Sequence, residues 1–184
     1  MIFLWYDLTD LSTGLPPQYN NLSIKPVTAP VVKGGALWPD HVNNLFYSFG
    51  DEYESRTFTK SFDNLWLYDT IYNTWNESNP DATQTGMLWP AHGASAVSDD
   101  GVAYYYDGWL NENTISGWQG HPLMLRGLLS FDMTSFKWTN RTFDDDTPRA
   151  EGSLNNLPVS DRGMLVYMGG IETTSSGAVM QTWE

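Results

Sequence analysis

The sequence predicts an all-β protein built from repeated units, and three observations support this. A phrase of apolar and aromatic residues followed by Asp occurs three times, and its aspartates, Asp7, Asp69 and Asp132, stand 62 and 63 residues apart. A fixed period of this size is typical of stacked supersecondary units. Aromatic residues form 15% of the 184 residues, and ten Pro and 16 Gly divide the chain at short intervals. Aromatic side chains favour strands, and Pro and Gly favour the turns between them.

Each unit is expected to begin with a strand led by glycine. Gly35, Gly93 and Gly152 open runs of small residues and lie 58 and 59 residues apart. A tight turn rich in Asn, Asp or Gly follows each run, because these residues adopt positive φ readily. A second strand then ends in glycine, where the missing Cβ permits a bend or a close approach of backbones. These second strands are predicted over 45–50, 102–108 and 164–170.

The third strand of each unit carries the repeated phrase, and the fourth carries a Trp. Trp75 and Trp138 stand six residues after Asp69 and Asp132, whereas Thr13 occupies that place in the first copy. The Asp is expected to accept hydrogen bonds from the backbone of its own turn. The Tyr, Phe and Trp side chains supply the apolar area that packs one sheet on the next. The sequence therefore predicts four strands in each complete unit.

This pattern resembles the kelch repeat, whose units are four-stranded blades of a β-propeller. The phrases are also similar to those of the large kelch-repeat proteins of filamentous fungi, within the galactose oxidase-like propeller superfamily. The resemblance implies a kelch-type β-propeller. Asp51 and Asp107 depart from the repeat's glycine pair, and the period exceeds the usual value of about 50 residues. The residues that mark the repeat are Gly35, Gly50, Tyr68, Asp69, Trp75, Gly93, Gly108, Phe131, Asp132, Trp138, Gly169 and Gly170.

The predicted propeller is incomplete. Within residues 1–184 we expect the end of one blade and a linker, two full four-stranded blades, and the start of a further blade, over 1–29, 30–88, 89–147 and 148–184 respectively. Propellers close with about four to eight blades. The chain is therefore expected to be a fragment of a longer propeller, with a protomer that needs copies of itself as the alternative.

Composition limits the function classes. The net charge is −13, and no basic patch is visible, which argues against nucleic-acid binding and against an anionic membrane surface. The chain has no Cys, so it has no disulfide, thiolate metal site or cysteine nucleophile. His41, His92 and His121 occupy unlike positions in the repeat, so neither a metal nor another cofactor is expected. No apolar run approaches the roughly 20 residues of a membrane span, and the apolar start is too short for a signal peptide.

The longest loops follow the glycine marks, over about 51–64, 109–126 and from 171 onward. Loops on a rigid scaffold commonly carry binding residues. The candidate partner-binding residues are Trp109, Glu112, Trp118 and His121, for a protein or a sugar; the alternative is a loop folded onto its own Trp residues. On the binding interpretation, Trp109→Ala is expected to leave stability nearly intact.

Three sequons, at Asn21, Asn76 and Asn140, are candidate glycosylation sites. Asn76 and Asn140 follow the Trp of the repeat and are expected on outermost strands. The sequons weakly favour an extracellular or cell-surface location.

The sequence favours a non-enzymatic protein-interaction or scaffolding module. It contains no nucleophile elbow, phosphate loop or paired-His metal motif. One alternative is a carbohydrate-binding propeller with Trp109 or Trp118 as the stacking platform. Another is the remnant of a galactose oxidase-like enzyme whose catalytic residues lie outside this chain, because the Tyr–Cys crosslink of that enzyme cannot form without Cys.

Overall fold

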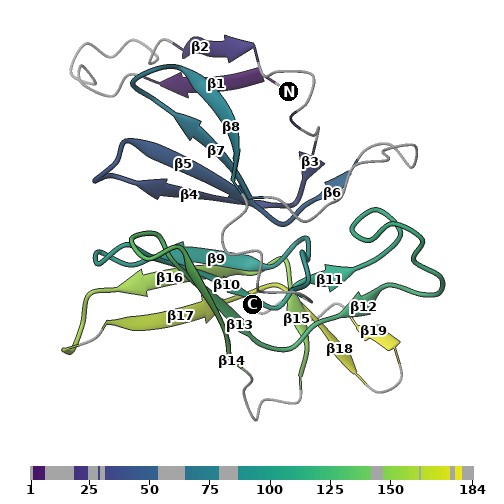
Figure 1. Cartoon of the computed structure of the whole chain (residues 1–184). Coiled ribbons are helices and arrows are strands. Elements are labelled where there is room, and N and C mark those ends of the chain that lie inside the picture. Colours follow the sequence, from purple (N-terminus) through teal and green to yellow (C-terminus); the bar gives the residue numbers. More distant parts are fainter. Residues whose placement is uncertain are drawn as a thin grey trace.

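The protein is all-β, as the sequence predicts. Every regular element in the described part of the chain is a strand, and all pairings are antiparallel (Figure 1). No helix in that part could cross a membrane. The computed structural model describes residues 2–6, 19–24, 29, 32–53, 65–78, 87–141, 147–161, 163–174 and 177–179.

Two four-stranded sheets form the body of the molecule. Their strands lie side by side in chain order, so both sheets have the four strands that the sequence predicts for a complete unit. The first sheet contains β4 (Ala36–Asp40), β5 (Leu45–Phe49), β7 (Leu65–Asp69) and β8 (Thr74–Ser78). The second sheet contains β9 (Ala94–Val97), β10 (Val102–Tyr106), β13 (Leu128–Asp132) and β14 (Lys137–Arg141).

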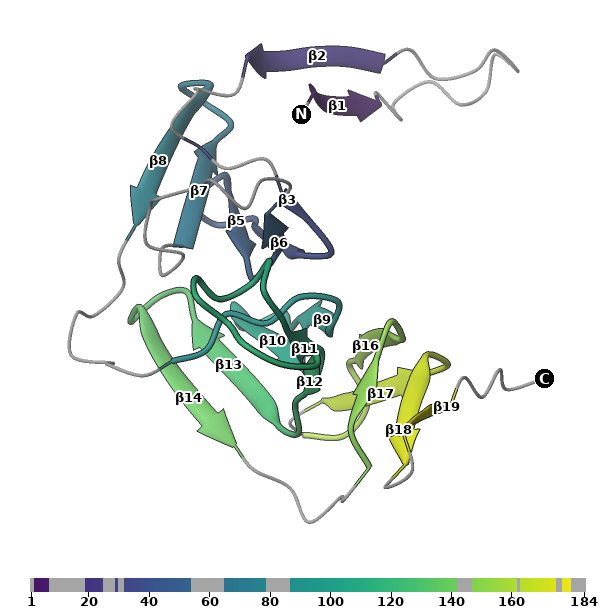
Figure 2. The ribbon, with the colours of Figure 1, turned by 90° about the vertical axis from the view of Figure 1, so that its right-hand side faces the viewer.

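Two-stranded pairs stand at both ends of this body. The N-terminal pair is β1 (Ile2–Tyr6) with β2 (Tyr19–Ile24), and the C-terminal pair is β16 (Ser153–Leu157) with β17 (Met164–Met168). Figure 2 shows the sheets following one another along an open arc, with β8 and β14 on its outer side. The N-terminal and C-terminal pairs lie at opposite ends of this arc.

The register of the N-terminal pair corrects one expectation. Tyr6 lies opposite Tyr19, as Tyr68 lies opposite Trp75 in the first sheet and Phe131 opposite Trp138 in the second. Tyr19, and not the residue six positions after Asp7, therefore occupies the place of the repeat's Trp. The sequence spacing was misleading because the connection between these two strands is longer than in the other units. Thr13 itself lies outside the described residues.

Short strand pairs gather at one end of the sheets, on the right in Figure 1, away from the turns that join first and second strands. In the first and third units they join the chain before the first strand to the chain after the second strand, and in the second unit they join the chain after the second strand to the chain before the third. They are the pairs β3 (Val32–Lys33) with β6 (Glu52–Tyr53) and β11 (Trp109–Leu110) with β12 (Leu123–Met124), and a three-stranded sheet in the order β15 (Arg149–Ala150), β18 (Ile171–Thr174) and β19 (Gly177–Val179). We call this end the loop face.

The predicted role of the turn aspartates is confirmed in both complete sheets. One carboxylate oxygen of Asp69 accepts hydrogen bonds of 2.8 and 2.9 Å from the amides two and three residues further on. Asp132 accepts the equivalent bonds, at 2.9 and 3.0 Å. The acceptor satisfies amides that the turn would otherwise leave without a partner. Asp7, the first copy, lies outside the described residues.

The core lies between the two complete sheets and is largely aromatic. Phe131 and Trp138 of the second sheet pack against Tyr47 and Phe49 of the first, with ring centroids 5.6 Å apart for Tyr47 and Phe131 and 4.8 Å apart for Phe49 and Trp138. Trp38 stacks on Phe49 at 5.0 Å. All five side chains are buried. Each ring of this kind buries about 150–250 Å², so this layer supplies much of the apolar burial that joins the sheets.

The end of each second strand has an unusual backbone. Two successive residues there have positive φ, whether or not they are glycine. A Cβ on Gly108 would lie 2.5 Å from the Ala91 carbonyl oxygen, and a Cβ on Gly170 would lie 2.4 Å from that of Ala150, so the predicted close approach of backbones is present. The pairs and their φ values are Gly50 and Asp51 (67° and 134°), Asp107 and Gly108 (54° and 91°), and Gly169 and Gly170 (72° and 89°).

Candidate functional site

The loop face is built on a series of left-handed residues. Gly34, His92 and Glu151 each precede the glycine that leads a first strand, and their φ angles are 74°, 58° and 58°. The amide of Glu151 donates to the carbonyl of His92 at 2.8 Å, and the amide of His92 donates to that of Gly34 at 2.6 Å. Three successive units are thus joined by main-chain hydrogen bonds at equivalent positions. The side chains of His92 and Glu151 are consequently fixed on the same face of the molecule.

Glu52 is the centre of a buried polar cluster beside this series. Its side chain is 6% exposed. One carboxylate oxygen accepts hydrogen bonds from Trp109 Nε1 at 2.9 Å and from Asn111 Nδ2 at 2.5 Å, and the other lies 3.3 Å from Lys33 Nζ. Burial by itself raises the pKa of Glu52, but these hydrogen bonds and the nearby His92 outweigh burial, so the pKa lies below its ordinary value. Glu52 is therefore held as a carboxylate.

His92 completes this cluster. Its imidazole lies nearly parallel to the Trp109 indole, with ring centroids 4.2 Å apart and an interplanar angle of 17°. Its Nε2 is 3.7 Å from a Glu52 oxygen, and its Nδ1 is 3.5 Å from Glu151 Oε1. A Cβ on Gly34 would lie 2.6 Å from this ring, so glycine is required there to leave room for it. We call Lys33, Glu52, His92, Trp109, Asn111 and Glu151 the Glu52 cluster.

Trp109 is therefore part of the fold as well as of the predicted binding loop. Asn111, two residues on, forms a tight turn in which its side-chain oxygen accepts the amides of Asn113 and Thr114 at 2.8 and 3.2 Å. The carbonyl of Asn113 accepts the amide of Tyr53 from the first unit at 3.0 Å. The base of the loop is thus fixed to two units at once.

The other candidate residues lie further out on the same loop. Glu112 and His121 are exposed, and Trp118 is half-buried. The indole nitrogen of Trp118 donates to the His121 carbonyl at 3.3 Å, within the loop itself. The structure therefore separates Trp109, at the anchored base, from the three residues that the loop presents outward. Sequence reasoning did not place Lys33, Glu52, His92 or Asn111 among the candidate binding residues. The signal that could have found them is their position near the glycines that mark the repeat.

A second polar group extends the loop face towards the C-terminal pair. Arg149 Nε lies 3.2 Å from Glu172 Oε1, and its Nη1 donates to the hydroxyl of Tyr106 at 3.3 Å. The Tyr167 ring packs on Tyr106 with centroids 5.1 Å apart. Burial, followed by the negative charge of Asp107, raises the pKa of Tyr167. This group joins the second and third units as the Glu52 cluster joins the first and second.

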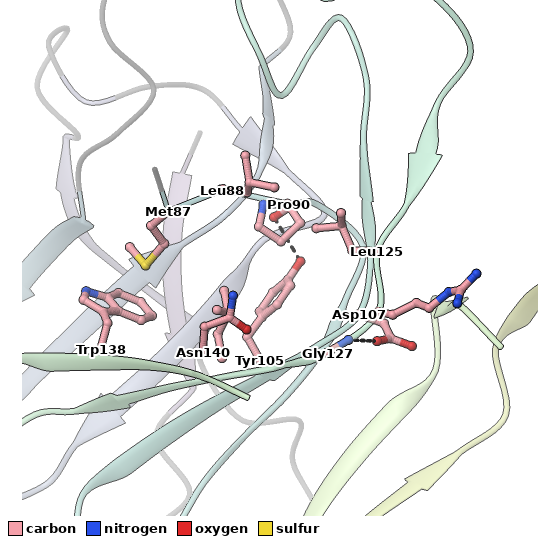
Figure 3. Close-up of a pocket in the computed structure, with 11 residues that line it drawn as sticks. Met87, Leu88, Pro90, Tyr105, Asp107, Leu125, Gly127, Trp138 and Asn140 are labelled. Carbon is pink, nitrogen blue, oxygen red and sulfur yellow. Dashed lines mark hydrogen bonds between the residues drawn. The ribbon is translucent and has the colours of Figure 1, made fainter. Parts of the chain in front are cut away.

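A recess of about 360 Å³ lies beside the second sheet, where the segment before β9 crosses it (Figure 3). Met87, Leu88, Leu125 and Trp138 make its walls mostly apolar. The hydroxyl of Tyr105 donates to the Pro90 carbonyl at 3.0 Å and accepts the amide of Gly93 at 2.8 Å. Burial raises the pKa of Tyr105 well above its ordinary value, so the hydroxyl stays protonated. The volume of the recess lies within the range of ligand sites, about 300–1,000 Å³.

This recess is a weaker candidate than the loop face. Its one carboxylate, Asp107, already accepts two main-chain amides, from Gly127 at 2.8 Å and Arg149 at 2.9 Å. Ligand sites usually combine apolar walls with a few polar groups aimed inward. The recess suits an apolar group, and its charged and amide-bearing lining residues are Asp107, Arg126 and Asn140.

The remaining predicted positions are placed as follows. Asn76 on β8 and Asn140 on β14 are exposed on the outermost strands, as expected, and Asn21 lies on β2. His41 and His121 are exposed. Within the described residues, no group of three His, Asp or Glu side chains could hold a metal ion.

Comparisons with known proteins give a likeness in fold. No family model matches the chain, and no curated protein matches it. Among solved structures, "Structure of YjhT" superposes with a TM-score of 0.51 at 16% sequence identity over 79% of this chain. That superposition covers 36% of YjhT, so the chain spans about a third of the structure it matches. The likeness concerns the path of the backbone.

Proposed function

We propose that the chain is part of a kelch-type β-propeller and acts as a non-enzymatic protein-interaction or scaffolding module. The repeated four-stranded sheets and their arrangement along an arc support the propeller. The backbone likeness to YjhT over 79% of this chain concerns the path of the backbone and does not bear on the kind of repeat. The partner would bind at the loop face.

One observation carries this proposal: the loop over 109–124 is anchored at its base and open at its tip. The Glu52 cluster fixes Trp109 and Asn111, while Glu112 and His121 are exposed and Trp118 is half-buried. A rigid base lowers the entropy lost when a loop binds, and an aromatic residue beside polar ones is typical of recognition surfaces.

The charge of the chain indicates the kind of partner. Glu112 and Glu151 are exposed on the loop face, and the net charge is −13. A protein with a basic surface would be steered towards this acidic chain, with an association rate that falls as salt is added.

A binding role fits the Glu52 cluster better than a catalytic one. Both carboxylate oxygens of Glu52 face donors or cations, and the ring of His92 is stacked on Trp109. These groups are engaged in joining units, which suits a scaffold. A catalytic acid or base must reach a substrate atom within hydrogen-bond distance.

Affinity capture tests the proposal with two triple variants. E112S/W118S/H121S alters the loop tip, and V42S/I71S/Y72S alters exposed turns at the opposite end. From an extract of the source organism, the wild type and the turn variant should retain a protein that the loop variant loses. Circular dichroism checks that both variants are folded. Equal retention by the loop variant, or loss by the turn variant, would contradict binding at the loop face.

A sugar is the second candidate ligand, and Trp118 is the residue that favours it. The Trp109 face is stacked against His92, whereas Trp118 is half-exposed on the outer loop. Aromatic faces suit the apolar faces of sugars. If the wild type binds a glycan on an array and Trp118→Ala does not, the result would support a carbohydrate-binding propeller. If no glycan binds while a protein is captured, the carbohydrate-binding alternative is wrong.

A further inference from the structure

Two sequon asparagines lie on equivalent outermost strands, but their side chains lie on different faces. Asn140 stands two residues after Trp138 on β14, and Asn76 stands one residue after Trp75 on β8. Both are exposed. Because successive side chains of a strand point to opposite faces, Asn140 shares the face of its tryptophan, whereas Asn76 lies on the face opposite to its own.

The face that Trp138 and Asn140 share borders the apolar recess. Both residues line it, together with Met87, Leu88 and Leu125. Figure 3 shows the two side chains on the recess side of their strand. Leu88 is 44% exposed, so part of this apolar wall is open to solvent. An exposed asparagine amide thus lies next to an apolar recess that solvent can reach.

We propose that Asn140 is an N-glycosylation site and that the first N-acetylglucosamine of its glycan packs in the recess. Asn140-Arg141-Thr142 is an acceptor sequence for this modification. The donor is an oligosaccharide on a lipid diphosphate. The bond between the anomeric carbon and the diphosphate oxygen breaks, and a bond from that carbon to Asn140 Nδ2 forms. The lipid diphosphate leaves, and Nδ2 releases one proton.

The recess has the size and the lining that one sugar needs. Its volume is about 360 Å³. The C–H groups of the sugar ring and the acetamide methyl group are apolar, and they would cover Met87 and Leu88. Arg126 also lines the recess, and a guanidinium has five N–H donors for the hydroxyl and acetamide oxygens of a sugar. Removing the apolar walls from water stabilises the folded chain.

The covalent bond to Asn140 supplies the orientation that the walls of the recess do not. A free ligand depends on several inward-facing polar groups to be held in one pose. A group on a short tether instead has an effective concentration in the millimolar range, so weak packing is enough to keep it in place. Asn76 does not line the recess, and its glycan would find no such wall there. A glycan on Asn140 should therefore stabilise the fold, and one on Asn76 should not.

Secretion of the chain from yeast behind an added leader tests occupancy and stability together. Mass spectrometry of the peptide that contains Asn140 should show a glycan. Thr142→Ala removes this sequon and Ser78→Ala removes that of Asn76, and neither changes the asparagine. Thr142→Ala should lower the melting temperature by about 2–4 °C, a shift expected for a modest loss of stability in a chain of this length. Ser78→Ala should lower it by less than about 1 °C.

Two further comparisons separate the sugar from the substitutions. In protein from a bacterial host that adds no glycan, the wild type and Thr142→Ala should melt at the same temperature. If they differ, Asn140→Gln replaces Thr142→Ala, and its shift in bacterial protein is subtracted from its shift in yeast protein. Trimming with an endoglycosidase that leaves only the first sugar should preserve the stabilisation, because that sugar is the one in the recess.

A substitution in the recess tests where the sugar lies. Leu88 and Leu123 are 44% and 50% exposed, but only Leu88 lines the recess. The stabilisation by the Asn140 glycan should shrink at least by half in Leu88→Ser and persist in Leu123→Ser. An unmodified Asn140 in a chain glycosylated at Asn76, equal melting of glycosylated wild type and Thr142→Ala, or an unchanged glycan effect in Leu88→Ser would each overturn the proposal. None of these outcomes bears on partner binding at the loop face.

Discussion

The Asp107 carboxylate accepts a hydrogen bond of 2.9 Å from the main-chain amide of Arg149, 42 residues further along the chain. Its other oxygen accepts the amide of Gly127 at 2.8 Å. Asp107 is buried and has a φ of 54° at a position where the C-terminal unit has Gly169. Positive φ is unfavourable for Asp107 because it has a Cβ. Its side chain nevertheless joins the second strand of one unit to the third strand of that unit and to the next unit.

Asp107→Ala should lower the free energy of unfolding by about 3 kcal/mol, since two hydrogen bonds to a charged acceptor are lost and Ala tolerates positive φ poorly. Asp107→Gly removes the same bonds without the backbone penalty, so it should cost about 1 kcal/mol less than the Ala variant. Urea denaturation measures both. Equal losses in the two variants would mean that the left-handed backbone adds nothing, and losses near zero would mean that the hydrogen bonds add nothing.

Stability should depend on pH through Glu52. Its pKa in the folded protein is lowered, so its carboxylate stabilises the fold fully above the ordinary value of 4.5, and the contribution is lost as pH falls through the folded-state pKa. Glu52→Gln removes this titration. The difference in unfolding free energy between wild type and Glu52→Gln should therefore shrink below about pH 4.5. A difference that stays constant from neutral pH into that acidic range would contradict the assignment.

The two repeat tryptophans should differ in their effect on stability. Trp138 is 5% exposed and packs against Phe49 and Phe131, with ring centroids 4.8 and 4.6 Å away. Trp75 is half-buried and contacts Tyr68 at 5.2 Å. Trp138→Ala should cost about 3–5 kcal/mol and Trp75→Ala roughly half as much, because a smaller cavity is left. Urea denaturation measures both losses of unfolding free energy. A loss below about 1 kcal/mol for Trp138→Ala would show that Trp138 does not contribute to the core.

Local rules predicted the strands well because each mark has a local cause. Asp69 and Asp132 bond the amides of their own turns, and Phe131 and Trp138 lie opposite each other across one hairpin. The N-terminal pair does not follow the six-residue spacing because its connection is longer, so Tyr19 lies opposite Tyr6 in the strand pairing. Pairing register, rather than a fixed count along the chain, sets which residues meet.

The candidate site was only partly predictable for a different reason. Trp109 and Glu52 are 57 residues apart, and their contact exists because consecutive units place equivalent positions side by side. Sequence reasoning singled out Trp109 by composition but had no means of pairing it with Glu52 or His92. Asp51 and Asp107 depart from the glycine pair in sequence, but both have positive φ, as the glycines beside them do.

Trp109 should matter for stability, which reverses the expectation from sequence alone. Trp109→Ala loses the stack on His92 and leaves an acceptor site on the buried Glu52 without its indole donor. We expect a loss of about 2–4 kcal/mol in unfolding free energy. Trp109→Phe keeps an aromatic ring and loses the hydrogen bond, so its cost should be about 1–2 kcal/mol.

Trp118→Ala is the matched control on the same loop, with an expected loss below about 1 kcal/mol because the side chain is half-exposed and bonds within the loop. Urea denaturation of the three variants separates the anchored base from the presented tip. If Trp109→Ala and Trp118→Ala cost the same, the Glu52 cluster does not hold the loop. If Trp109→Phe costs as much as Trp109→Ala, the hydrogen bond to Glu52, and not the ring stack, supplies the stabilisation.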